Sequence, residues 1–90
     1  MVTRSEILDT AREYVTQDRA ATHGDAERNF NLIADYWTAY LNLNRQISAS
    51  DVAVMMCLLK IARIGSSPHN LDNWVDACGY MACGGEIVAE

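Results

Sequence analysis

The sequence predicts an all-α protein, a compact four-helix antiparallel bundle whose chains associate into oligomers. Apolar residues recur at the 3.6-residue spacing of a helix in four segments, and no stretch alternates with a period of two for long enough to suggest a sheet. Half of the 90 residues are hydrophobic and one is proline, which excludes a disordered chain. A chain of this length forms a single domain, residues 1–90, and buries only about 60–65% of its unfolded surface, so self-association is a natural way to cover the rest.

The first two helices each carry one apolar stripe. The first begins at Thr3, which forms a potential capping box with Glu6. Its stripe is Ile7, Leu8, Ala11, Tyr14 and Val15. The segment 19–25 interrupts the period: Gly24 is free to adopt a positive φ, and Asp25 is placed to cap the next helix. That helix runs from about Ala26 to Leu43, with an apolar side of Phe30, Ile33, Ala34, Trp37 and Leu41.

The third helix, capped by Ser48 or Ser50, is apolar nearly all round from Val52 to Ile61. This pattern indicates a central helix enclosed by the other helices or by a second subunit, and Gly65 can end it with a left-handed residue. The last helix starts near Leu71. Its small residues from Gly79 to Gly85 suggest close packing of another helix, between subunits or within the chain, or a break near Gly84.

The charge balance limits the classes of partner. Seven Lys and Arg stand against 12 Asp and Glu, a net charge of −5, which argues against nucleic acid as the main partner. No apolar run is long enough to span a membrane and the N-terminus has no apolar signal region, so we expect a cytoplasmic protein without a membrane partner. Cys57, Cys78 and Cys83 lack zinc-site spacing and read as reduced, buried thiols.

Two charged pairs are the candidate binding residues. Asp72 and Asp76, four residues apart on one helix face, repel each other unless a cation such as Mg²⁺ lies between them. Lys60 and Arg63 leave the third helix side by side, where they can grip a phosphate. Each pair also has a simpler interpretation: a solvated face for the acids, and for the cations a helix terminus ion-paired to Asp72 or Asp76.

Other polar residues carry weaker signals. Glu27, Asn31 and Asp35 form a strip on the second helix that is either a solvated face or part of a ligand site. His23 and His69 lie in loops. Each is a surface residue, a helix cap or a hydrogen-bond donor to a bound phosphate. The aromatic residues Trp37, Trp74, Tyr36, Tyr40 and Tyr80 offer a base-stacking surface or simply belong to the core. No nucleotide-binding glycine loop, zinc motif or nucleophile with a base at motif spacing is present, so nucleophilic catalysis has no support.

The order of short motifs along nearly the whole chain resembles a family of short bacteriophage and prophage proteins. The residues that carry this resemblance are His23-Gly24-Asp25, Asn29-Phe30, Ile33-Ala34, Trp37, Tyr40-Leu41, Asp51-Val52-Ala53, Met55-Met56, Leu58 to Arg63, Pro68-His69, Asp72, Trp74, Asp76 and Gly79-Tyr80. The resemblance does not itself imply an activity. It does imply that the expected location of the protein is the cytoplasm of an infected host cell.

More distantly, the chain resembles the MazG-like all-α nucleoside triphosphate pyrophosphohydrolases. These are oligomeric helical bundles in which two acidic pairs on different helices bind Mg²⁺. Asp72 and Asp76, followed by Tyr80, look like a shifted second pair, whereas the second helix offers only Glu27 and Asp35, which are eight residues apart, for the first pair. This departure puts hydrolysis in doubt more than it does the fold.

Three functions follow as hypotheses. In the favoured one, an oligomer binds a nucleotide or nucleotide-derived signal through Lys60, Arg63, His69, Asp72 and Asp76 and so sequesters a host defence messenger. The alternative is a Mg²⁺-dependent pyrophosphohydrolase with Asp72 and Asp76 as metal ligands. Either Glu27 or Asp35 would complete its metal site. The third is a protein that inhibits a host factor by direct contact, which requires no pocket.

Overall fold

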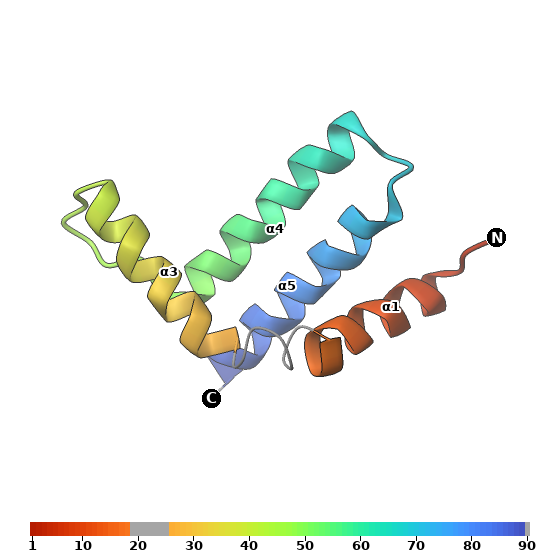
Figure 1. Cartoon of the computed structure of the whole chain (residues 1–90), viewed down its shortest axis with the longest axis horizontal. Helices are drawn as coiled ribbons and strands as arrows, with labels where there is room; N and C mark the ends of the chain where they lie inside the picture. Colours follow the sequence, from red (N-terminus) through yellow and green to blue (C-terminus); the bar gives the residue numbers. More distant parts are fainter. Residues whose placement is uncertain (19–25, 90) are drawn as a thin grey trace.

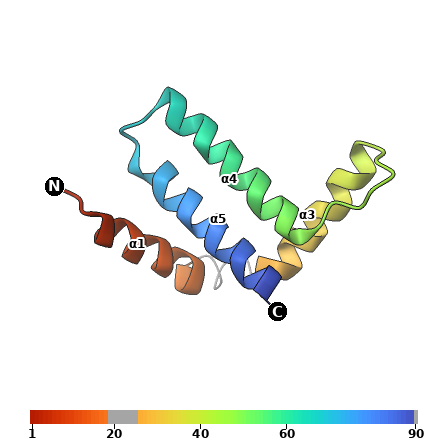
Figure 2. The same ribbon diagram turned by 180° about the vertical axis from the view of Figure 1, so that it is seen from behind.

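The computed structural model describes residues 1–18 and 26–89, and every regular element among them is helical. The elements are α1 (Arg4–Glu13), a short π-helical continuation η1 (Tyr14–Asp18), α3 (Ala26–Tyr40), α4 (Ala49–Ser66) and α5 (Leu71–Ala89). Figures 1 and 2 show α4 and α5 side by side as an antiparallel pair, with α1 along α5 and α3 diverging from the N-terminal end of α4. The predicted all-α class with four α-helices is confirmed for the described residues, and their packing is compatible with a bundle.

Helix α1 begins as the sequence predicts. The Thr3 hydroxyl accepts a hydrogen bond from the Glu6 N–H at 3.2 Å, and the Glu6 carboxylate accepts one from the Thr3 N–H at 3.3 Å, which completes the capping box. Ala11 is buried, but Leu8 is 60% exposed. Its predicted place in the buried stripe is wrong, because α1 packs against α5 alone among the other helices described and only a narrow stripe is covered.

Helix α3 ends three residues before the predicted Leu43. Asn42 adopts a φ of 53°, a left-handed conformation that asparagine tolerates better than most residues. The N–H groups of Asn42 and Leu43 then donate to the carbonyls of Ala39 and Thr38, each at 3.1 Å, in a Schellman arrangement. The chain turns away at this point, so Leu41 is exposed rather than part of the apolar side of α3.

Helix α4 starts at the predicted cap and ends later than predicted. Ser48 is the N-cap, and its capping box is closed by Asp51. Gly65 does not end the helix, which continues to Ser66; the Ser67 N–H donates to the Arg63 carbonyl at 2.8 Å. The stop is explained by Pro68, because a residue that precedes proline is disfavoured in the helical region, and Ser67 has a φ of −141° and a ψ of 67°.

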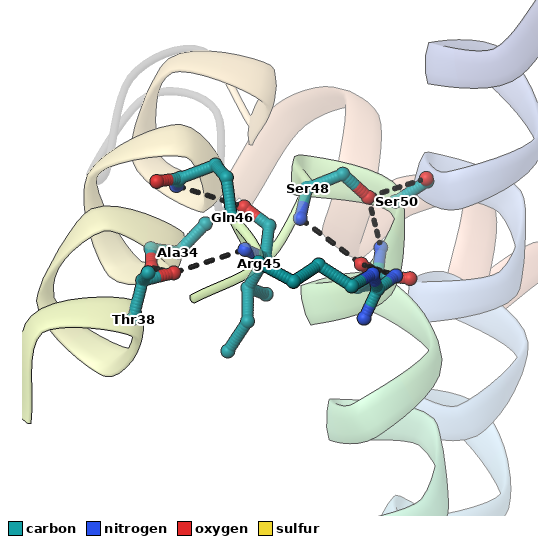
Figure 3. Close-up of polar contacts among 8 residues, drawn as sticks. Ala34, Thr38, Arg45, Gln46, Ser48 and Ser50 are labelled. Atoms are coloured by element: carbon teal, nitrogen blue, oxygen red, sulfur yellow. Dashed lines mark hydrogen bonds and ion pairs between the residues drawn. The ribbon is translucent and has the colours of Figure 1, made fainter. Parts of the chain in front are cut away.

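The connection between α3 and α4 is held by side chains of both helices (Figure 3). The Thr38 hydroxyl donates to the Ala34 carbonyl at 2.7 Å and accepts from the Ile47 N–H at 2.9 Å. Gln46 donates to the Asp35 carboxylate at 2.9 Å, and Ile47 itself is buried in the core. These bonds fix the place at which α3 departs from α4.

Because of the capping box of α4, the free energy of unfolding depends on pH in the acidic range. The Ser48 N–H, then the Ser48 hydroxyl and the Arg45 guanidinium, lower the pKa of Asp51 below its ordinary value. A lowered folded-state pKa stabilises the protein above the unfolded pKa, and this contribution disappears as the pH falls through the folded value. We expect Asp51→Asn to be less stable than wild type at about pH 6 and to approach it below about pH 3. Urea midpoints measured across this range test the prediction; a constant difference between the two proteins would contradict it.

The core lies where α3, α4 and α5 meet. Val52 and Ala53 of α4 are fully buried against Phe30 and Ala34 of α3. A Cβ atom built on Gly84 would lie 2.9 Å from the Ala53 Cβ, so this glycine lets α5 approach α4 closely. The helix continues through Gly84, so the glycine has a packing role within the chain rather than marking a break.

One side of α4 stays uncovered within a single chain. We call it the outer face of α4; its residues are all exposed and are Val54, Met55, Leu58, Leu59, Ile61 and Ala62. The predicted enclosure of this helix by its neighbours therefore holds for the opposite side only. Despite these apolar residues, none of the described helices has both the length and the apolar content needed to cross a lipid bilayer.

Candidate functional site

A cavity of about 570 Å³ lies between α1, η1, α3 and α5. This volume falls within the roughly 300–1,000 Å³ that is typical of small-molecule sites. Its apolar wall is formed by Ala11, Val15, Phe30, Ile33, Val75, Gly79 and Ile87. Gly79 allows η1 to approach, because a Cβ atom there would lie 3.0 Å from the Val15 side chain.

Carboxylates from two helices face this cavity. Glu27 lies in the first turn of α3, whereas Asp76 and Glu86 come from α5. None of the described lining residues is a lysine, arginine or histidine. The part of the cavity wall formed by described residues is therefore acidic and apolar rather than basic.

Lys60 and Asp76 form an ion pair between α4 and α5. The Lys60 Nζ lies 3.0 Å from the Asp76 carboxylate, and the two side chains are only 13% and 10% exposed. Lys60 belongs to the inner side of α4, so its methylene chain is buried while its charge reaches the carboxylate. The cations were interpreted either as phosphate-binding residues or as partners of Asp72 or Asp76. For Lys60 the structure shows the second, an ion pair across the helix hairpin.

Three other predicted site residues lie near the turn between α4 and α5. Arg63, His69 and Asp72 are all exposed and do not line the cavity. The turn is ordered by its own bonds: the Asn70 side chain accepts from the Asp72 N–H at 3.2 Å, and the Trp74 indole donates to the Pro68 carbonyl at 3.0 Å. Of the five predicted ligand-binding residues, the structure thus joins Lys60 to Asp76 directly, and Asp76 alone of these five lines the cavity.

The predicted metal ligands are separated in the same way. Glu27 and Asp76 line one cavity, whereas Asp72 is exposed one turn before Asp76. Among residues 1–18 and 26–89, no group of three or more His, Cys, Asp or Glu side chains is arranged to hold a metal ion. What the described residues offer is a pair of carboxylates from different helices.

The polar strip on α3 divides among three environments. Glu27 lines the cavity, Asn31 is exposed, and Asp35 accepts the hydrogen bond from Gln46 that fixes the α3–α4 connection. His23, together with the predicted features at Gly24 and Asp25, lies outside the described residues.

Phe30, Cys83 and Glu86 line the cavity but were not predicted as site residues from the sequence. Phe30 forms a tilted aromatic pair with Tyr80, one of the predicted base-stacking candidates; the ring centroids are 6.2 Å apart, and both residues line the cavity. Glu86 and Cys83 follow Asp76 and Tyr80 on α5 at intervals of three or four residues, so helical spacing alone identifies them as neighbours on one face. Burial, and then the charge of Glu86, raises the pKa of Cys83, which keeps this thiol protonated and poorly nucleophilic.

Comparisons with known proteins place the chain among phage proteins. It is 45% identical over 74 residues to the Gene 55 protein of Mycobacterium phage L5, covering 82% of this chain and 47% of the relative. It is 34% identical over 84 residues to the Gene 55 protein of Mycobacterium phage D29, covering 93% of this chain and 54% of the relative. The chain thus spans about half the length of these relatives.

No solved structure matches the chain. A family described as a domain of unknown function, DUF6378, matches residues 6–88, which is nearly the whole sequence. This match and the two relatives confirm the predicted resemblance to a phage protein family, and the chain belongs to the DUF6378 family.

Proposed function

We propose that the protein binds a phosphorylated nucleotide together with Mg²⁺ in the cavity between α1, η1, α3 and α5. The observation that carries the proposal is that Glu27 and Asp76, far apart in the sequence, line one cavity with the aromatic pair of Phe30 and Tyr80. If the nucleotide is held without turnover, the protein would sequester a nucleotide-derived signal in a phage-infected cell.

The charge of the cavity favours a metal complex over a bare phosphate. Three carboxylates among the described residues line it, and they would repel a free phosphate. Mg²⁺ is commonly bound by one or two carboxylates, with water and substrate phosphates in its other positions. Carboxylate oxygens of Glu27 and Asp76 are the kind of ligand this ion prefers. Lys60, whose Nζ lies 3.0 Å from the Asp76 carboxylate, orients that side chain.

The aromatic pair supplies the other half of a nucleotide site. A nucleobase that stacks on an aromatic side chain gains about 1–3 kcal/mol regardless of its identity. Phe30 and Tyr80 lie on the apolar wall, and the polar side chains of Asn29 and Thr16 also line the cavity. Support for the proposal therefore comes from two kinds of group, one for each end of a nucleotide.

The same carboxylates also favour the second candidate, a Mg²⁺-dependent nucleoside triphosphate pyrophosphohydrolase of MazG-like type. Its metal site would again use Glu27 and Asp76. Pyrophosphate release separates the two functions: binding without release supports sequestration, and release that depends on Mg²⁺ supports hydrolysis.

Glu27→Gln tests the proposed site with little change in shape. We expect it to weaken Mg²⁺-dependent nucleotide binding at least tenfold, about 1.4 kcal/mol, because one of two metal-binding carboxylates is lost. Calorimetry with linear and cyclic nucleotides, with and without Mg²⁺, measures this. The matched control is Asp72→Asn, which removes the same charge from an exposed position outside the cavity and should bind like wild type.

Two results would overturn the proposal. One is the absence of any binding tighter than roughly 100 μM, about −5.5 kcal/mol, across the nucleotide panel with Mg²⁺. The other is binding that Glu27→Gln and Asp72→Asn weaken equally, since that would place the nucleotide outside the cavity.

A further inference from the structure

The outer face of α4 has the pattern of a helix that packs against another helix. Val54, Leu58, Ile61 and Gly65 follow one another at intervals of four, three and four residues, and the spacing is repeated by Met55, Leu59, Ala62 and Ser66. Alternating intervals of four and three residues are typical of the seam between two helices that cross at a shallow angle. Among the helices that the structure describes, none covers this seam, because α5 and α3 contact the inner side of α4.

The chain exposes more surface than a compact monomer of its mass. Its accessible surface is 6465 Å² for 10.0 kDa. Monomeric proteins of this mass expose about 5,200 Å², so the excess is about 1,200 Å². The radius of gyration is 13.9 Å, compared with about 12 Å for a compact domain of this length. A standard interface covers about 800 Å² on each partner, so the excess is sufficient for one such interface.

We propose that the outer face of α4 is the dimer interface, on which α4 of a second copy of this chain packs in the antiparallel direction. At a two-fold interface each residue near the axis meets its own copy, so a charged residue there would repel itself. The outer face meets this requirement: between Asp51 and Arg63 the single charged residue of α4 is Lys60, which lies on the inner side bound to Asp76. The antiparallel direction also sets the dipoles of the two helices against each other favourably.

An axis near Leu58 brings apolar residues of the two copies together without opposing like charges. In that register Val54 of one copy lies opposite Ala62 of the other, and Met55 lies opposite Ile61. Asp51 lies opposite Gly65, so no two like charges meet. The proposal does not depend on a nucleotide, because the outer face of α4 contributes no residue to the lining of the cavity.

Sedimentation equilibrium on three proteins tests the interface. Wild type should have twice the 10.0 kDa mass of the chain, and Leu58→Glu should be monomeric, with a dissociation constant raised at least 100-fold. The matched control is Leu8→Glu, because Leu8 on α1 is 60% exposed and Leu58 is 57% exposed. This control should remain dimeric.

A cross-linking experiment keeps the test valid if Leu58→Glu fails to fold. Leu58→Cys should form a disulfide-linked dimer on oxidation, because the two copies of residue 58 meet at the axis, whereas Leu8→Cys should not. A wild-type protein that is monomeric at about 100 μM would overturn the proposal and leave the face to a different partner. A dimer that survives Leu58→Glu would overturn it as well.

Discussion

Replacement of Lys60 by methionine is expected to destabilise the protein by about 3 kcal/mol. The side chains of Lys60 and Asp76 are only 13% and 10% exposed, so the variant removes a cation that lies 3.0 Å from a largely buried carboxylate. Loss of one partner of a buried ion pair costs much more than the pair itself contributes, because the remaining charge is neither solvated nor neutralised. Urea denaturation measures the difference in the free energy of unfolding, with the curves of wild type and variant fitted to one shared denaturant slope m.

Arg63→Met is the matched control for this experiment. It removes the same charge one turn later on α4, from an exposed side chain in the last turn of the helix. There the cation contributes only through the helix dipole, at most about 1 kcal/mol. If Lys60→Met were no more destabilising than Arg63→Met, the ion pair with Asp76 would contribute nothing to the folded state.

Gly84→Ala and Gly85→Ala are expected to change stability in opposite directions, although the two residues are adjacent in α5. At Gly84 the new methyl group would meet the fully buried Ala53 Cβ at 2.9 Å, which forces α4 and α5 apart. Such overpacking costs about 1–3 kcal/mol. The gain in helix propensity is about 1 kcal/mol, so we expect a net loss of up to about 2 kcal/mol.

At Gly85 nothing lies within 4 Å of the added methyl group, so the gain in propensity is retained as a stabilisation of about 0.5–1 kcal/mol. Each kcal/mol shifts the melting temperature by about 4–8 °C in a domain of this size. Thermal unfolding of both variants at one protein concentration shows whether each change raises or lowers the melting temperature. Equal shifts would show that α5 is not held against α4 at Gly84.

Local chemistry made much of the fold predictable. The caps at Thr3 and Ser48 are fixed by hydrogen bonds between residues three apart, and such bonds can be recognised without knowledge of the tertiary structure. The end of α4 was misjudged because Gly65 permits a stop, whereas Pro68 imposes one. Leu8 shows a more general limit: periodicity tells which residues share a face, but not whether a neighbour covers that face. Leu41 was missed for another reason, because α3 ends at Tyr40 and the apolar period continues past the end of the helix.

The candidate site was predictable only in part, for a similar reason. Lys60 and Asp76 were singled out by their spacing, and the antiparallel hairpin of α4 and α5 brings them together. Asp72 shares a helix face with Asp76, but it lies one turn nearer the hairpin end and is exposed. The cavity itself depends on where α1, η1 and α3 lie against α5, which no local pattern specifies.

The attachment of α1 also affects how a molecule would reach the cavity. Among the described residues, α1 and η1 contact each other and α5 but neither α3 nor α4, whereas the hairpin of α4 and α5 is the most extensive helix pair. Segments with few tertiary contacts open at a lower free energy than the whole domain, and their amide hydrogens exchange sooner. The wall of the cavity that α1 and η1 form is thus the one most weakly attached to the rest of the described structure. Partial opening of the N-terminal segment, with the hairpin and its ion pair still folded, would give the proposed ligand a route into the cavity.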